Sequence, residues 1–360
     1  MRFVLDETSI TCLPDSESET KGLNDRKIPI NLTNHTLYFF DKVPKRLPQP
    51  DHLALICFIT FYPYLKNSGR IIFPRPVSKI WHQILKMHEI TTDVNYSTQS
   101  LEKHKYPIKQ SIALAFGGGL DSWAALRLQP DLYSILIHER DFEDPVLSDS
   151  IPNLIQVTTN YKSVSTILKP TPRSAGWTTW VGVLITSLWL SAEYELTGIA
   201  TGGNLGSVFL NNGTKYHPTH LKPSIWYKTF TLLDLPIYLP LAGLTDLGVV
   251  RIIGPYIDNI RYCWFPKPDG SNCHNCDKCL RKELLLGRDN STGKSFDGPS
   301  FKYLRTNDPN LARWINHYYT PALNLLPKSF DKNGLIRALN EKSIQLLSQE
   351  DNHLVEQYGL

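Results

Sequence analysis

From residue 111 onward, short apolar runs rich in β-branched residues alternate with longer segments of helical character. The runs expected to form strands cover 111–116, 133–137, 154–159, 196–202 and 237–242. The segments expected to form helices cover 121–129, 177–194 and 245–253. A repeated strand-then-helix order is typical of a parallel sheet with helices on both faces, so the pattern predicts an α/β fold.

The pattern changes on either side of this region. Residues 1–105 hold short β-like runs at 36–40 and 70–73 and a mixed apolar stretch at 52–65, without a chemical motif. Residues 288–360 open with a polar, glycine-bearing linker and continue as expected helices at 308–316 and 333–349. We therefore predict an accessory N-terminal α+β domain (1–105), a central domain (106–287) and a C-terminal linker with helices (288–360).

Composition and charge narrow the class of protein. With 360 residues, 41% of them hydrophobic, the chain can bury a sizeable core, and its net charge of +4 is spread without a polybasic run. The uncharged run 174–192 carries several Ser and Thr residues, so a buried helix is expected there rather than a membrane span. Acidic residues at 6 and 7 interrupt any signal peptide. The expected setting is cytoplasmic.

Three consecutive glycines, Gly117 to Gly119, follow the first strand of the central region. A turn between a strand and a helix rarely needs more than one glycine, whereas bare backbone amides at a helix start can bind phosphate. Neither G-x-x-x-x-G-K-[ST] nor G-x-G-x-x-G matches the turn. The pattern favours a phosphate-binding turn of another kind, with a tight turn that binds nothing as the alternative.

Four of the six cysteines, Cys263, Cys273, Cys276 and Cys279, lie within seventeen residues at spacing C-x9-C-x2-C-x2-C. Thiols at this spacing wrap readily around a tetrahedral ion and are poorly placed for disulfides. We expect a closed structural zinc site, with an iron–sulfur cluster or plain unpaired cysteines as alternatives. His274 is a candidate substitute ligand. His217 and His220 are expected in an irregular loop rather than at a second metal site.

These motifs together resemble the 7-cyano-7-deazaguanine synthase family of the PP-loop ATP pyrophosphatase superfamily. The matching pieces are "GGGLDS" (117–122), "HER" (138–140), "GIATGGNLG" (198–206), "YLPLAGLTD" (238–246) and the four cysteines. The resemblance covers about 111–287. The stretch 51–78 resembles the N-terminal part of longer synthase-like proteins, which indicates a divergent member with an extra N-terminal domain.

The resemblance implies an ATP-dependent ligase chemistry. The carboxylate of 7-carboxy-7-deazaguanine attacks the α-phosphate of ATP, pyrophosphate leaves, and ammonia captures the acyl-adenylate; a second adenylation dehydrates the amide to a nitrile. Activation of this kind is needed because a carboxylate is a poor electrophile until one oxygen becomes a good leaving group. Mg²⁺ would accompany ATP, and Zn²⁺ would be structural.

The resemblance also assigns roles to residues. Asp121 and Ser122 would be catalytic, with Asp121 helping to hold Mg²⁺ on the leaving pyrophosphate. Contacts with ATP would come from Phe116, Gly117, Gly118, Gly119, Leu120, Asp121, Ser122, Ile137, His138 and Gly202. Contacts with the substrate would come from Gly203, Asn204 and Arg173. The chain departs from the family pattern at Gly117, where the family has Ser, and at Asp246, where it usually has Lys.

Two other functions fit the same motifs. The adenylated base could pass to an amine of a protein or another acceptor, as is plausible for synthase-like proteins of bacterial defence loci. Alternatively, the chain could be a nucleotide-binding subunit without catalysis. The expected partners are ATP, a deazaguanine carboxylate and ammonia or an amine, with no membrane; the resemblance is compatible with a homodimer.

Overall fold

The computed structural model describes a large part of the chain. The described residues are 1–23, 29–32, 35–40, 42–98, 111–140, 151–161, 163–164, 182–204, 210–211, 215–216, 222–241, 246–253, 256–257, 260–263, 267, 271–274, 276 and 279. The expected helices of the C-terminal segment, at 308–316 and 333–349, therefore lie outside the described residues.

The chain folds into two compact units, each assembled from separate segments. Unit 1 takes Met1–Gly117, Ser134–Ile199 and Ser224–Tyr238, and unit 2 takes Gly118–Tyr133, Ala200–Pro223 and Leu239–Leu360. N-terminal residues thus share unit 1 with strands of the central region. The boundaries at 105/106 and 287/288 stay predictions.

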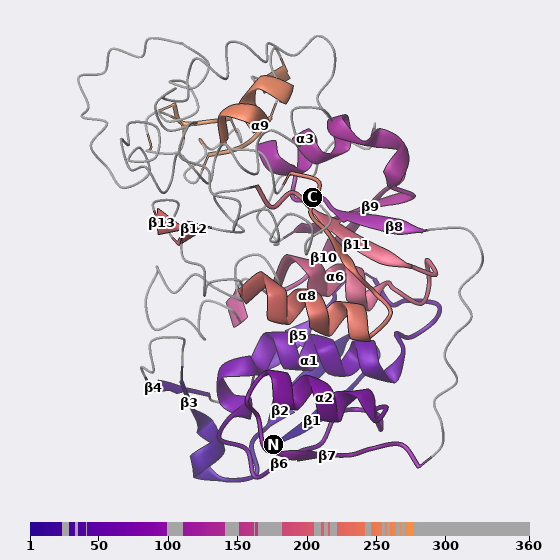
Figure 1. Cartoon of the computed structure of the whole chain (residues 1–360), viewed down its shortest axis with the longest axis vertical. Coiled ribbons are helices and arrows are strands. Elements are labelled where there is room, and N and C mark those ends of the chain that lie inside the picture. Colours follow the sequence, from indigo (N-terminus) through magenta and orange to yellow (C-terminus); the bar gives the residue numbers. More distant parts are fainter. Residues whose placement is uncertain are drawn as a thin grey trace, which may run out of the picture. The chain divides into compact units, whose positions relative to one another are not determined.

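A five-stranded sheet forms the centre of the fold, in the order β10-β9-β8-β11-β14 (Figure 1). Its strands are β8 (Ile112–Ala115), β9 (Ile135–Arg140), β10 (Leu154–Thr158), β11 (Gly198–Thr201) and β14 (Ile237–Tyr238). β9 pairs in parallel with both β8 and β10. All four residues of β8 are buried, as expected for a parallel strand covered on both faces. The sequence prediction of an α/β fold with parallel strands flanked by helices is confirmed.

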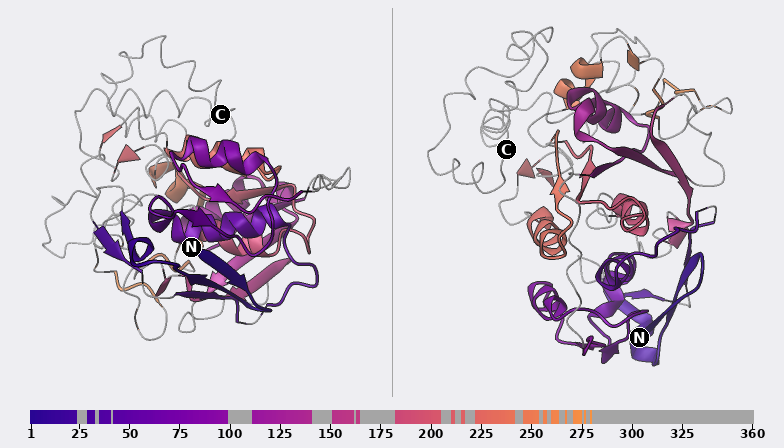
Figure 2. Two further views of the ribbon diagram at one scale, coloured as in Figure 1. Left: turned by 90° about the horizontal axis from the view of Figure 1, so that it is seen from below. Right: turned by 90° about the vertical axis from the view of Figure 1, so that its right-hand side faces the viewer.

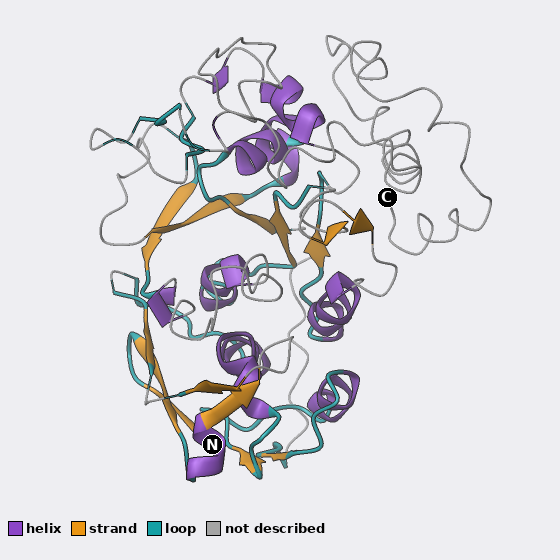
Figure 3. Ribbon diagram, turned by 90° about the vertical axis from the view of Figure 1, so that its left-hand side faces the viewer, coloured by secondary structure: helices purple, strands orange, loops and turns teal. Residues whose placement is uncertain are grey.

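Helices of unit 1 form two layers beneath the sheet, as Figure 3 shows. They are α1 (Pro50–Leu65), α2 (Ile80–Met87), α6 (Ile185–Trp189), which follows the 3₁₀ turn Gly182–Leu184, and α8 (Lys222–Leu232). In Figure 2, α6 lies over α1 and α8 lies over α2. α1 opens with a proline at its first position, where the missing N–H costs nothing. Nearly every described side chain of α1 is buried, because the helix lies between other elements.

The helix predicted at 177–194 is confirmed only for Ile185–Trp189, where α6 lies. α6 ends at Trp189, and turns follow up to Glu195, whose φ of 49° is left-handed. The hydroxyl of Ser191 donates to the carbonyl of Leu188 at 2.8 Å, which is the kind of local bond by which Ser competes with helix continuation. Among the described helices, none combines the length and the apolar character that a membrane crossing requires.

The N-terminal residues add an antiparallel sheet of β1 (Arg2–Leu5), β2 (Ser9–Leu13) and β5 (Thr36–Tyr38). Two smaller pairs accompany it: β3 (Lys21–Leu23) with β4 (Pro29–Asn31), and β6 (Arg70–Ile71) with β7 (Asp93–Val94). Beyond β5, Phe39 forms an antiparallel bridge with Thr159 at the end of β10. The ring of Phe39 stacks on Trp189 with 4.2 Å between centroids. These contacts make the N-terminal sheet part of the core of unit 1.

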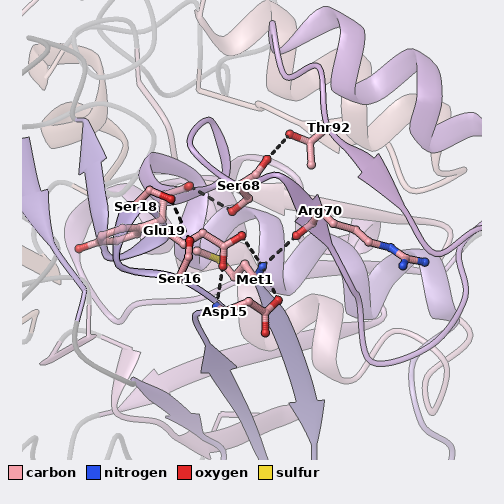
Figure 4. A network of polar contacts seen from close by, with 9 residues as sticks. Met1, Asp15, Ser16, Ser18, Glu19, Ser68, Arg70 and Thr92 are labelled. Atoms are coloured by element: carbon pink, nitrogen blue, oxygen red, sulfur yellow. Dashed lines mark hydrogen bonds and ion pairs between the residues drawn. The ribbon is translucent and has the colours of Figure 1, made fainter.

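A polar network surrounds the buried Met1 (Figure 4). Its amino group donates to Asp15 at 2.9 Å, to Glu19 at 2.6 Å and to the carbonyl of Arg70 at 2.8 Å. The carboxylate of Glu19 also accepts the backbone N–H of Asp15 at 2.7 Å. A buried cation with three acceptors is satisfied, so this network stabilises the packing of β1 against β6.

Unit 2 is built around α3 (Leu120–Leu128) and α9 (Asp246–Ile253), which pack against each other. α3 ends just before Pro130, which opens the short 3₁₀ turn Pro130–Leu132, since proline is poorly tolerated inside a helix. The guanidinium carbon of Arg127 lies 4.0 Å from the ring centroid of Tyr256. A two-stranded pair, β12 (Leu210–Asn211) with β13 (Lys215–Tyr216), also belongs to this unit.

Candidate functional site

Of the three glycines of the turn, only Gly118 has a backbone conformation that favours glycine. Gly118 has a φ of 69°, in the left-handed region that favours glycine. Gly119 caps α3 with a φ of −83°, which any residue can adopt. A Cβ added to Gly117 or to Gly119 would meet no protein atom within 4 Å. One glycine is therefore explained by backbone conformation, and the other two leave open space beside the turn.

Ser122 and Asp121 lie in the first turn of α3. The hydroxyl of Ser122 donates to the carbonyl of Gly119 at 2.9 Å, and the side chain is only 6% exposed. Asp121 is half-buried, and its Oδ1 accepts a hydrogen bond from Nδ2 of Asn204 at 3.0 Å. In this structure the Ser122 hydroxyl is engaged in a hydrogen bond to the backbone of the turn, and the Asp121 carboxylate accepts one from an amide in a distant part of the chain.

The segment after β11 approaches the start of α3 very closely. A Cβ on Gly202 would lie 2.6 Å from the carbonyl carbon of Asp121 and 2.8 Å from the amide nitrogen of Ser122. Such distances leave no room for a side chain, so glycine is required by packing alone. Gly203 is half-buried, and the side chain of Asn204 is buried. The two segments that the sequence analysis assigned to ATP and substrate are thus in contact within unit 2.

In unit 1, the residue before the glycines is fixed by the neighbouring strand. The buried Phe116 donates its N–H to the carbonyl of Ile137 at 2.8 Å. Its own carbonyl accepts from Nδ1 of His138, also at 2.8 Å. His138 lies within β9 and is 5% exposed, and its bond to Phe116 gives it a structural task just after the end of β8.

Among the residues that the structure describes, none of the others that the sequence assigned to ATP, substrate or metal is shown at the turn in a binding position. Leu120, the first residue of α3, is 3% exposed and is a core residue. Arg173 and the pair His217 and His220 lie outside the described residues. Asp246 is the first residue of α9, and nothing more is described of its side chain.

The four cysteines converge on one point in unit 2. Their sulfur atoms all lie within 4.8 Å of one another, with 3.7 Å between Cys263 and Cys276 and 3.9 Å between Cys273 and Cys279. Four thiolates at about 2.3 Å from a tetrahedral ion are about 3.8 Å apart. A cluster of several irons holds its thiolates on different metal atoms and therefore farther apart. The group could hold a single metal ion such as zinc.

Backbone amides support the cysteine group. The N–H of Cys273 points to Sγ of Cys263 at 3.4 Å, and the N–H of Cys276 points to Sγ of Cys273 at 3.3 Å. His274 adopts a φ of 57° between them and is exposed, outside the group of four. Burial raises the pKa of the Cys279 thiol, and hydrogen bonds with Cys276 and Cys263 raise it further. A bound cation has the opposite effect, because it favours the thiolate.

Asn272 is a buried residue of this centre that the sequence analysis missed. Its Oδ1 accepts the N–H groups of Tyr262 at 2.9 Å and Cys263 at 3.0 Å, and its Nδ2 donates to the carbonyl of Ile260 at 2.9 Å. One side chain therefore fixes the segment that carries Cys263 beside the segment that carries Cys273. Its position directly before a metal-spaced cysteine was the only available signal.

Comparison with known proteins covers only part of the chain. Residues 225–289 match a family of unknown function (DUF6395). This stretch holds most of α8, β14, α9 and the cysteine group, but not the glycine turn. No curated protein was found to match the chain.

Proposed function

We propose that this chain binds Mg·ATP at the glycine turn and adenylates a carboxylate with release of pyrophosphate. The observation that carries the proposal is the contact between the turn and the segment after β11. Gly202 rests on the Asp121 backbone, and Asn204 holds the Asp121 carboxylate. Two motifs that the resemblance links to ATP and to substrate are separated by about 80 residues in the chain, yet they meet.

The local geometry suits a polyphosphate. Open space lies beside Gly119, the first amides of α3 are the positive end of its dipole, and Asp121 offers a carboxylate for Mg²⁺. The protein's contribution would be to position the phosphates and to neutralise charge on the leaving pyrophosphate. 7-Carboxy-7-deazaguanine is the carboxylate that the sequence resemblance suggests first, with ammonia as the acceptor and an amide or a nitrile as the product.

Zinc is proposed for the cysteine group, in a structural role. The sulfur separations fit one tetrahedral ion, and four thiolates close its coordination without a position for substrate. Such an ion would tie together Cys263 and the three cysteines that follow it, and so stabilise unit 2.

The direct test is turnover. Purified chain is incubated with Mg·ATP and 7-carboxy-7-deazaguanine, with and without ammonium, and pyrophosphate and the base are followed by mass spectrometry. We expect pyrophosphate release that depends on the carboxylate. Asp121→Ala should reduce it about a hundredfold or more, because a charged group aimed at the transition state is lost. Asp131→Ala removes an exposed carboxylate of the same unit and should leave the rate unchanged.

The outcomes separate the candidates. Absence of pyrophosphate under every condition, with Mg·ATP still bound, would replace the enzymatic proposal by the non-catalytic nucleotide-binding subunit. That second candidate draws support from Gly117, which lacks a hydroxyl, and from Ser122, whose hydroxyl donates to Gly119. Pyrophosphate without amide or nitrile would favour transfer to another amine.

A further inference from the structure

Three segments of unit 1 meet at the ring of His52, which lies on α1 and is 1% exposed. Its Nδ1 lies 2.9 Å from Oγ of the buried Ser191, in the turn after α6. Its Nε2 lies 3.1 Å from the carbonyl oxygen of Leu233, just after α8. The Ser191 hydroxyl also donates to the carbonyl of Leu188 at 2.8 Å. These four residues form the His52 junction, in which buried polar groups depend on one another for their hydrogen bonds.

The three contacts of the His52 junction need one proton more than the neutral side chains carry. A neutral imidazole has one N–H and a serine hydroxyl has one O–H, whereas a carbonyl oxygen only accepts. If the two protons go to the two carbonyls, Nδ1 and the Ser191 oxygen face each other at 2.9 Å as two acceptors. If the hydroxyl donates to Nδ1 instead, its oxygen faces the Leu188 carbonyl at 2.8 Å with no proton between them. A doubly protonated ring satisfies all three contacts.

His88, another buried histidine of unit 1, has a different proton count. The hydroxyl of Thr229 donates to the carbonyl of Ile225 at 2.8 Å, so its oxygen accepts from Nε2 of His88 at 2.9 Å. One ring proton is enough for that contact. Burial, and to a smaller extent the charge of Lys66, lower the pKa of His88 to about 3. The two histidines therefore differ in the number of protons that their hydrogen-bond partners require.

Carboxylates outnumber cations along the segments that form the His52 junction. The titratable side chains that adjoin these segments in the sequence are Lys45, Arg46, Asp51, Glu193, Tyr194, Glu195 and Asp234. Arg46 is already paired with Glu195 at 2.9 Å. Burial opposes a positive charge on the ring, whereas two acceptors on its nitrogens and a surplus of carboxylates favour it. Only the protonated ring leaves none of the three contacts unmade.

We propose that His52 is a pH-sensitive switch of unit 1, doubly protonated near neutral pH and neutral in alkaline solution. The protonated ring donates to Ser191 and to Leu233, and so ties α1 to the turn after α6 and to the end of α8. Loss of the proton leaves two acceptors face to face, so one of the three contacts must open. Unfolded histidines titrate near pH 6.5, so the stability that His52 contributes is complete below that pH and is lost as the folded ring gives up its proton at higher pH.

The experiment is nitrogen NMR of the whole chain, with isotope-labelled histidine, from pH 5.5 to 9.5. A histidine that titrates at pH 6.5 is protonated in only about one molecule in ten at pH 7.5. We expect both ring nitrogens of His52 to give the shifts of a doubly protonated ring at pH 7.5. The signal is assigned by its loss in His52→Gln. A ring that is mostly neutral at pH 7.5 would overturn the inference.

Ser191→Ala tests the proton count, because it removes one acceptor and leaves the ring in place. In this variant His52 should be mostly neutral at pH 7.5 and should gain its second proton only in more acidic solution. Ser187→Ala deletes a buried hydroxyl of α6 that has no hydrogen-bond partner among the described residues, and should leave the titration unchanged. Histidine signals that titrate alike in wild type and Ser191→Ala would count against the switch. If His52→Gln does not fold, the signal that responds to Ser191→Ala alone is that of His52.

Urea unfolding checks the link between this proton and stability. The unfolding midpoint of wild type should fall more steeply from pH 7.5 to 9.5 than that of Ser191→Ala, in which the ring is already neutral. Ser187→Ala should keep the wild-type slope. Equal slopes in wild type and Ser191→Ala would mean that the proton does not stabilise the junction, and the switch would be ruled out.

Discussion

The two units use their buried polar side chains for different purposes. In unit 1, His52 bonds through Nδ1 to Ser191 at 2.9 Å and through Nε2 to the carbonyl of Leu233 at 3.1 Å. His88 bonds to Thr229 at 2.9 Å. Each histidine joins segments that are far apart in sequence. In unit 2, the polar groups gather at the glycine turn and at the cysteines, where each cluster could hold a ligand.

Packing accounts for the buried histidines of unit 1. His88 lies among the rings of Phe58, Tyr62 and Trp226, with centroids 4.7 to 5.4 Å away. Packing does not account for four thiols within 4.8 Å of one another, or for the open space beside Gly119. Substitutions of the buried histidines of unit 1 should therefore cost stability, and substitutions of the four cysteines or of Gly119 should cost metal or ligand binding.

The largest effect is expected at the cysteine group. Cys276→Ser removes one of four soft ligands, and metal affinity should fall well beyond the 10- to 100-fold that outer partners of a site usually contribute. Elemental analysis of the purified chain should find one zinc per wild-type molecule and little in the variant. Cys12→Ser makes the same change at a buried cysteine of unit 1 and should keep the metal.

Zinc retained at one per chain in Cys276→Ser, with unchanged affinity, would show that the cysteine group does not bind the metal as we propose. Iron in place of zinc would mean that the cysteine group is a metal site, as proposed, but that it holds a different metal. Asn272→Ala gives a graded case, because it leaves all four sulfurs and removes only the buried amide that holds the Cys263 segment. Its metal affinity should fall about 10- to 100-fold.

The next effect is a loss of stability in acid that comes from His88. Burial, and to a smaller extent the positive charge of Lys66, lower the pKa of His88 from 6.5 to about 3. The unfolded chain binds this proton below pH 6.5 whereas the folded chain stays neutral, so stability is complete above pH 6.5 and is lost as pH falls toward 3. The slope is about 1.4 kcal/mol per pH unit.

Urea unfolding of wild type and His88→Gln between pH 7.5 and 4.5 measures this slope. The variant should be less stable at pH 7.5, because it loses ring packing, and its stability should fall less steeply in acid. His82→Gln changes an exposed histidine on α2 and should retain the wild-type slope. Equal slopes in all three proteins would show that His88 does not titrate as its burial requires.

The smallest effects are expected at two glycines of unit 2, of which Gly202 is limited by packing and Gly119 is not. Gly202→Ala forces a methyl group into the Asp121 backbone and should lower stability by at least about 1 kcal/mol. Gly119→Ala adds the same methyl where no protein atom lies within 4 Å, so stability should be unchanged or slightly raised. Thermal unfolding and Mg·ATP titration of both variants provide the measurements.

Under the proposed function, Gly119→Ala should weaken Mg·ATP binding although it folds normally, since its methyl occupies space left for phosphate. A variant that binds as wild type does would mean that the open space is not where the phosphates lie. A large stability loss in Gly119→Ala would remove the distinction between the two glycines.

Sequence patterning predicted the strands of the central sheet and the helices α3 and α9 to within a few residues, because apolar runs and the glycines or prolines beside several of them are local signals. It failed at 190–194, where Ser191 bonds to Leu188 and turns replace the end of the expected helix. It also left α1 as a mixed apolar stretch, because a helix buried nearly all round shows no polar face to read.

The sequence by itself determined that four thiols stand at metal-binding spacing and that three glycines follow a buried strand. Both follow from residue identity and covalent distance along the chain. Only the tertiary structure decided that Asn272 fixes the Cys263 segment, that Gly202 must be glycine, and that Asn204 reaches Asp121. These contacts depend on close approach between segments separated along the chain, and such approach is set by the packing of strands and helices.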